Sequence, residues 1–135
     1  MNPTQLWSLL AAAPGPELEA LADQILAATP DIEVVTGPEV VSVPLRWASE
    51  AGEVIIGHTT ITTCQMSLAG TLGDGVRPGR DLPGAVAAAV CAAEVARQGT
   101  RGDQIRDLAH SGERTRKLRA QQRADLVEAT RLDHT

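Results

Sequence analysis

The sequence predicts a single α+β domain, with an antiparallel sheet placed between two helical regions. Apolar residues recur at helical spacing near the N-terminus, as Leu6, Leu9 and Leu10 illustrate. β-Branched residues dominate residues 32–68, and helical patterns return after Asp81. A chain of 135 residues is long enough for one core and too short for two. We therefore expect one domain over residues 1–135.

Two helices are expected before the sheet, over residues 5–13 and 17–28. Asn2 or Thr4 can cap the first helix, because both side chains accept hydrogen bonds from free backbone N–H groups. Pro14-Gly15-Pro16 is expected to separate the two helices.

Three stretches rich in β-branched residues predict strands, over residues 32–36, 40–47 and 53–68. Short connections between them favour antiparallel pairing. Turns are expected at Gly37-Pro38, at Ala51-Gly52 and in the glycine-rich residues 70–75. Pro44 predicts that its strand is at an edge or contains a bulge, since proline has no N–H to donate.

An Ala-rich helix is expected after the strands. Asp81 can cap it, Pro83 suits its first turn, and Gly99 is expected to end it. The preceding segment GTLGDGVRPGRD contains neither of the common glycine-rich phosphate motifs. Two interpretations stay open here: Arg77 and Arg80 hold an anion at the helix N-terminus, or Arg80 pairs with Asp81 or a neighbouring subunit.

Residues 100–135 form a charged helical tail, with a break or bend expected near Ser111-Gly112. Three basic residues follow one stripe, and the apolar stripe is thin; these positions are Arg116, Arg119 and Arg123, and Leu118 and Leu126. A helix with so weak an apolar face gains little stability alone, so it packs across a subunit boundary or stays mobile.

Charge is distributed unevenly: the net charge of −5 divides into −7 for residues 1–93 and +2 for residues 94–135. This asymmetry favours a tail with its own partner or a self-complementary contact, and a solvated helix face of mixed charge is the alternative.

Composition also disfavours several function classes. Nucleic-acid binding is not expected, because the chain is acidic and its only aromatic residues are Trp7 and Trp47. Neither a signal peptide nor a membrane span is expected, since long uncharged apolar runs are missing. Cys64 and Cys91 are expected to be reduced and buried in a cytoplasmic protein.

Few residues are candidates for catalysis. His58, His110 and His134 are too far apart in sequence to form a metal motif. Cys64 can act as a nucleophile only if a histidine reaches it in the fold. One functional hypothesis is a stand-alone small enzyme or anion-binding homo-oligomer that uses Cys64, His58 and Arg80.

Several motifs, taken in order, resemble the PhnG subunit family of the bacterial carbon–phosphorus lyase system. They are LWSLLAAAPGPEL, PEVVSVPLRW followed by GHTTITTCQMSLAG, GRD at residues 79–81, and the closing ERTRKLRAQQRADLVEATRLD. The family motifs fall on Gly57, Thr60, Thr62, Cys64, Gly79, Arg80 and Asp81. Leu82-Pro83-Gly84 departs from the basic and His-containing continuation of the family motif, which argues against a phosphate contact by Asp81.

The resemblance implies an accessory subunit in organic phosphonate catabolism. In that family, PhnG joins PhnH, PhnI and PhnJ subunits in a core complex that transfers a phosphonate to the ribose of ATP with loss of adenine, before the carbon–phosphorus bond is broken. S-adenosylmethionine and an iron–sulfur cluster are implied for the complex. We expect this subunit to bind no cofactor alone, since it has two cysteines. A homodimer is an alternative state for the isolated subunit.

Overall fold

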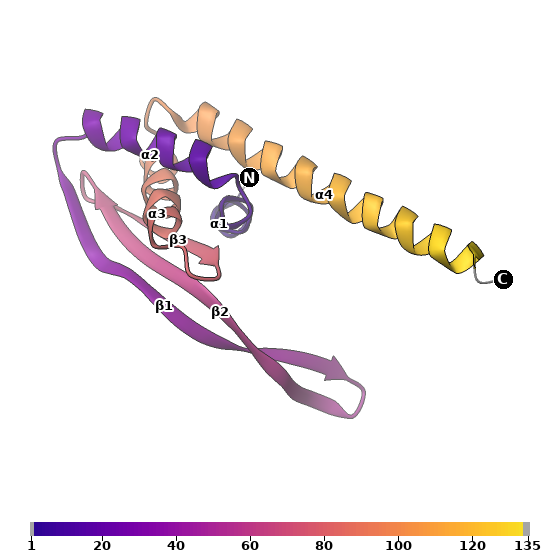
Figure 1. Cartoon of the computed structure of the whole chain (residues 1–135). Helices are drawn as coiled ribbons and strands as arrows, with labels where there is room; N and C mark the ends of the chain where they lie inside the picture. Colours follow the sequence, from indigo (N-terminus) through magenta and orange to yellow (C-terminus); the bar gives the residue numbers. More distant parts are fainter. Residues whose placement is uncertain (1, 134–135) are drawn as a thin grey trace.

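The structure is a computed structural model that describes the backbone of residues 2–133, with side chains except those of Arg116 and residues 131–133. His134 therefore lies outside the described residues. The order of elements confirms the expected α+β class (Figure 1). It runs α1 (Pro3–Ala11), α2 (Gly15–Ala28), β1 (Ile32–Ser49), β2 (Gly52–Leu68), β3 (Thr71–Pro78), α3 (Leu82–Ala96) and α4 (Gly102–Asp133).

Both N-terminal helices begin two residues earlier than predicted. Asn2 caps α1 by accepting a hydrogen bond of 2.7 Å from the backbone N–H of Gln5, which confirms Asn2 as the cap. A proline lies in the first turn of each helix, Pro3 in α1 and Pro16 in α2. Proline is tolerated there because the first N–H groups of a helix have no partner within it.

The sheet has three antiparallel strands in the order β1-β2-β3, so β1 and β3 are its edges. The expected turn at Gly37-Pro38 was wrong: the stretches 32–36 and 40–47 form one strand, and register shifts around Thr36 accommodate the irregularity. Pro44 lies on the edge strand next to a further register shift between Leu45 and Arg46, as predicted.

The glycine-rich segment was also assigned wrongly, because most of it is strand β3 and the turn is confined to Ala69 and Gly70, which have positive φ. Gly73 and Gly75 face α3 at close range. A Cβ atom on Gly73 would overlap backbone atoms of Ala89 and Ala93, and one on Gly75 would overlap Ala85 and Ala89. These two glycines are therefore needed because α3 packs closely against β3, and they do not form a turn.

Helix α3 is the centre of the core. It is buried on nearly every side, and it packs against β3, β2 and α2. Its small residues allow close approach to the sheet, where Cys64, Met66 and Leu68 of β2 belong to the same buried cluster. The core therefore forms without Phe or Tyr.

Helix α4 is continuous from Gly102 to Asp133, so the expected break near Ser111-Gly112 was wrong. Ile105 and Ala109 are fully buried, and Gly112 lies against Ala12 and Ala13. The glycine thus allows α4 to lie close to Ala12 and Ala13, and it does not interrupt the helix. Beyond Glu113 the described side chains are exposed, and the helix extends away from the body (Figure 1).

We predict that Gly73→Ala or Gly75→Ala lowers the free energy of unfolding by about 2 kcal/mol or more, because the added methyl group must displace the α3 backbone. Urea unfolding monitored by circular dichroism measures the change. Gly37→Ala is the matched control, since a Cβ there meets nothing within 4 Å. Equal stability of all three variants would contradict the packing role of the two glycines.

Candidate functional site

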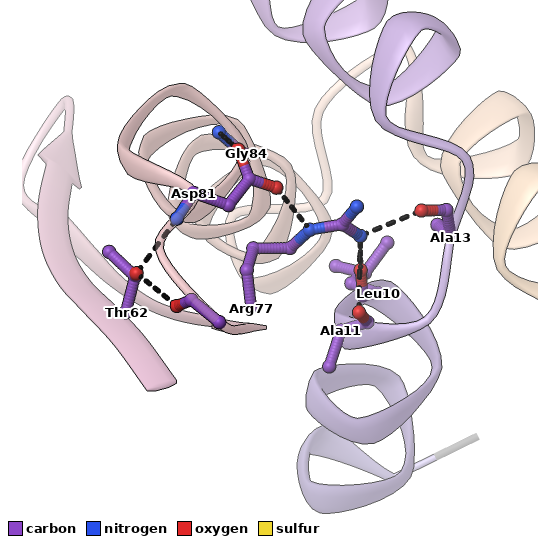
Figure 2. Close-up of polar contacts among 8 residues, drawn as sticks. Leu10, Ala11, Ala13, Thr62, Arg77, Asp81 and Gly84 are labelled. Atoms are coloured by element: carbon purple, nitrogen blue, oxygen red, sulfur yellow. Dashed lines mark hydrogen bonds and ion pairs between the residues drawn. The ribbon is translucent and has the colours of Figure 1, made fainter. Parts of the chain in front are cut away.

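The Gly79-Arg80-Asp81 motif forms the turn between β3 and α3, and Figure 2 shows its last residue, Asp81. Asp81 is the N-cap of α3, as predicted, and its Oδ1 accepts a hydrogen bond of 3.0 Å from the backbone N–H of Gly84. Gly79 has a φ of +70°, a left-handed conformation that glycine adopts without steric cost. The motif therefore contains a turn residue and a helix cap.

Thr62 of β2 fixes this turn from the sheet side. Its buried hydroxyl donates to the carbonyl oxygen of Gly79 at 2.7 Å and accepts from the backbone N–H of Asp81 at 2.9 Å. The backbone N–H of Gly79 donates to the Thr60 carbonyl at 2.8 Å. Four of the predicted motif positions are thus joined in one hydrogen-bond network. Figure 2 shows Thr62 and Asp81 of this network.

Arg77 extends this network to α1. Its Nε donates to Asp81 Oδ2 at 3.0 Å, and its Nη1 donates to the carbonyl oxygens of Leu10, Ala11 and Ala13 at 2.9, 3.1 and 2.7 Å. The guanidinium is largely buried and satisfies carbonyls that the end of a helix leaves unpaired. It also places a positive charge at the negative end of the α1 dipole.

The ion pair with Asp81 that one interpretation of the sequence assigned to Arg80 is therefore formed by Arg77. Arg80 is exposed and makes no ion pair within the described part of the chain, whereas Arg77 pairs with Asp81. Sequence reasoning missed the role of Arg77 because its main partners are backbone carbonyls more than 60 residues away. No local pattern reports such a contact.

Cys64, His58 and Arg80 are not brought to a common point. Cys64 is buried, and its Sγ donates to the carbonyl oxygen of Thr36 at 3.4 Å. Burial raises the pKa of this thiol above its ordinary value, which disfavours the nucleophilic thiolate. His58 is exposed on the same strand six residues earlier, a separation of about 20 Å along β2. This arrangement does not favour the stand-alone enzyme.

Cys91 and Glu94 lie together inside α3. Burial, followed by the negative charge of Glu94, raises the pKa of the Cys91 thiol to about 12. Glu94 Oε1 accepts from Arg97 Nε at 2.6 Å, and Arg97 also reaches the hydroxyl of Thr29 at 3.5 Å. The ion pair between Glu94 and Arg97 therefore connects the C-terminal end of α3 to the C-terminal end of α2.

A hollow of about 900 Å³ lies beside the sheet, lined by residues of both kinds of element: α1, α3 and α4, and all three strands. The residues that line it include Trp7, Cys64, Asp74 and Arg106, and Arg106 pairs with Asp103 at 3.2 Å.

No group of three or more His, Cys, Asp or Glu side chains that could hold a metal ion occurs within the described residues. No helix in the described range is long and apolar enough to cross a membrane.

Two exposed segments extend from the body, and we name them the hairpin arm and the helix arm. The hairpin arm is residues 44–56, the end of the β1-β2 hairpin, in which every residue is exposed. The helix arm is residues 114–130 of α4, in which every described side chain is exposed. In Figure 1 both arms run from the body toward the right of the view.

Comparison with protein-family models matches residues 3–135 to the family described as phosphonate metabolism protein PhnG. The chain belongs to the PhnG family. Its membership places it in phosphonate metabolism. A comparison with curated proteins found no match.

The PhnG motif positions predicted from sequence fall in two places. Thr60, Thr62, Gly79 and Asp81 form the turn network, with Arg80 exposed beside it. Gly57 and Cys64 lie elsewhere along β2, one at the base of the hairpin arm and one in the core. The predicted assembly residues Leu118, Arg119, Arg123 and Leu126 are exposed on the helix arm, and the side chain of Arg116 lies outside the described set.

We predict that Arg77→Met lowers the free energy of unfolding by about 2–3 kcal/mol, because the carbonyl oxygens of Ala11 and Ala13 lose their hydrogen-bond donor and the Asp81 carboxylate loses its ion pair. Chemical denaturation measures the loss. Arg80→Met is the matched control and is expected to stay within about 0.5 kcal/mol of the wild type. The network has no such role if both substitutions leave the stability unchanged.

The raised pKa of the Cys91 thiol predicts that the protein loses stability at high pH. The thiol ionises near pH 9.0 in the unfolded chain and near pH 12 in the folded one, so the folded state binds more protons between these values. Stability therefore falls as pH rises from 9, by up to about 1.4 kcal/mol per unit. Denaturation from pH 8 to 10.5 tests this, with few competing groups because the chain has no Tyr and one lysine, Lys117.

Cys91→Ala is the comparison variant for this measurement. Its stability is expected to fall less steeply above pH 9, because no thiol at this position ionises on unfolding. Parallel curves for the wild type and the variant would show that the Cys91 thiol does not cause the pH dependence.

Proposed function

We propose that this PhnG family member is an accessory subunit of the carbon–phosphorus lyase core complex, without an active site of its own. In this role it supports transfer of a phosphonate to the ribose of ATP with loss of adenine. The observation that carries the proposal is the dispersal of its reactive groups: Cys64 and Cys91 are buried, and His58 is exposed far from either. General acid–base and nucleophilic catalysis need such groups within hydrogen-bond reach of one another.

The cofactors of the pathway do not fit this chain alone. The common iron–sulfur clusters are held by four cysteine thiolates, whereas the sequence has two cysteines. Both thiols are buried, and burial raises the pKa of each. We therefore assign no step that involves the cluster, S-adenosylmethionine or ATP to residues of this subunit.

Partner subunits of the PhnH, PhnI and PhnJ types supply the chemistry in this proposal. Two arms free of the core are consistent with such a role, because an exposed apolar patch such as that of the hairpin arm commonly marks a protein interaction site. Free, buried thiols suit a reducing compartment, so we place the assembly in the cytoplasm.

Reconstitution with purified subunits tests the proposal. We expect adenine release from ATP and a simple alkylphosphonate to require this chain together with its partners, and the chain alone to release none. High-performance liquid chromatography measures the adenine that is released. Adenine release by the isolated chain would support the stand-alone enzyme instead.

A genetic control separates the phosphonate role from general fitness. Cells lacking this chain are expected to grow on inorganic phosphate and to fail on a phosphonate as the sole phosphorus source, with growth restored by the wild-type chain. Normal growth of these cells on the phosphonate would contradict the proposal.

A further inference from the structure

The hairpin arm has one apolar face and one face that carries a charge pair, which we call the polar face. Cross-strand pairing places Trp47 opposite Val54, and alternation along β1 places Leu45 on the same side. The other face carries Arg46 and Glu53, whose charges pair at 3.7 Å, and it also carries Ile55, which lies opposite Arg46 in the register. The paired charges suit contact with water, so the Trp47 face is the one that a protein surface would cover.

The apolar face is large for so small an element. Trp47 is 61% exposed and Val54 is 57% exposed, and the arm also exposes Leu45 and Ile56. Together these side chains leave on the order of 400 Å² of apolar surface in water, comparable with the largest patch on an ordinary monomer. A standard interface buries roughly 800 Å² on each partner. The hairpin arm therefore provides about half of a stable interface.

The helix arm provides a second surface of different chemistry. Residues 114–130 contain five basic and two acidic residues, a net charge of +3 in a chain whose total is −5. Leu118, Leu126 and Val127 are exposed among them. Lys117 pairs with Glu113 at 3.1 Å, but Arg119 and Arg123 form no ion pair within the described residues. The arm extends away from the acidic body of its own chain (Figure 1), so these two charges are available to an acidic surface.

We propose that the two arms bind one partner subunit at two patches, an apolar patch covered by the Trp47 face and an acidic patch along the helix arm. The inference rests on the proposed function, which supplies the partner. Stacking of two copies through their hairpin faces would bury only about half of a standard interface. A single partner that contacts both arms reaches the full size and uses both chemistries.

Salt dependence distinguishes the two contacts. Apolar burial is little affected by ionic strength, whereas charge attraction between exposed groups is screened. We expect Trp47→Ser with Val54→Ser to weaken binding of the co-expressed and purified PhnH-, PhnI- and PhnJ-type subunits by about 30-fold or more, at both 50 mM and 500 mM salt. Arg119→Glu with Arg123→Glu should weaken binding about tenfold at 50 mM salt and little at 500 mM.

The experiment uses the full chain and measures dissociation constants by calorimetry or surface capture. Arg46→Gln with Glu53→Gln is the matched control on the polar face of the hairpin arm and should bind within about twofold of the wild type. All variants should unfold at the wild-type temperature, because the arms lie outside the core.

The outcomes separate the inference from the proposed function. If the wild type binds none of these subunits, the proposed function fails. If the wild type binds and the Trp47/Val54 variant binds equally well, only the two-arm inference fails. It also fails if the charge-reversed variant loses the same affinity at both salt concentrations, or if native mass spectrometry finds a homodimer that the Trp47/Val54 substitutions dissociate while partner binding is unchanged.

Discussion

The fold depends on the guanidinium of Arg77, which connects α1, β3 and α3 through hydrogen bonds and an ion pair. It binds the last carbonyls of α1 and the carboxylate that caps α3, and it extends from the end of β3. The negative end of one helix dipole and the anionic cap of another are both compensated by one cation. Lysine could not provide these contacts, because it lacks the planar fork of donors.

Small residues allow the elements at this junction to approach one another closely enough for Arg77 to contact them. The core contains neither Phe nor Tyr, so no large aromatic rings separate the backbones, and neighbouring elements lie close together. Gly73 and Gly75 on β3 and the alanines of α3 are in direct contact, so β3 holds Arg77 at a defined distance from the start of α3. The turn motif and its Thr62 support thus follow from how closely α3 lies on the sheet.

Local signals in the sequence predicted the parts of the fold that depend on neighbouring residues. Asn2 and Asp81 were recognisable as caps, and Pro44 correctly indicated an irregular edge strand. The glycines of β3 and Gly112 were interpreted as turn or break residues, although each accommodates a distant backbone. Arg77 was missed for the same reason: its partners are close in space and remote in sequence. The motif positions were placed by resemblance, and their contacts became apparent only in the fold.

The continuity of α4 has a mechanical consequence. Its first turns are held in the core by Ile105 and Ala109, and Gly112 touches Ala12 and Ala13 next to the carbonyls that Arg77 binds. The same helix continues without interruption through residues 114–130, whose described side chains are exposed. A protein bound to these distal turns is therefore connected to the junction of α1, β3 and α3 by a single unbroken helix.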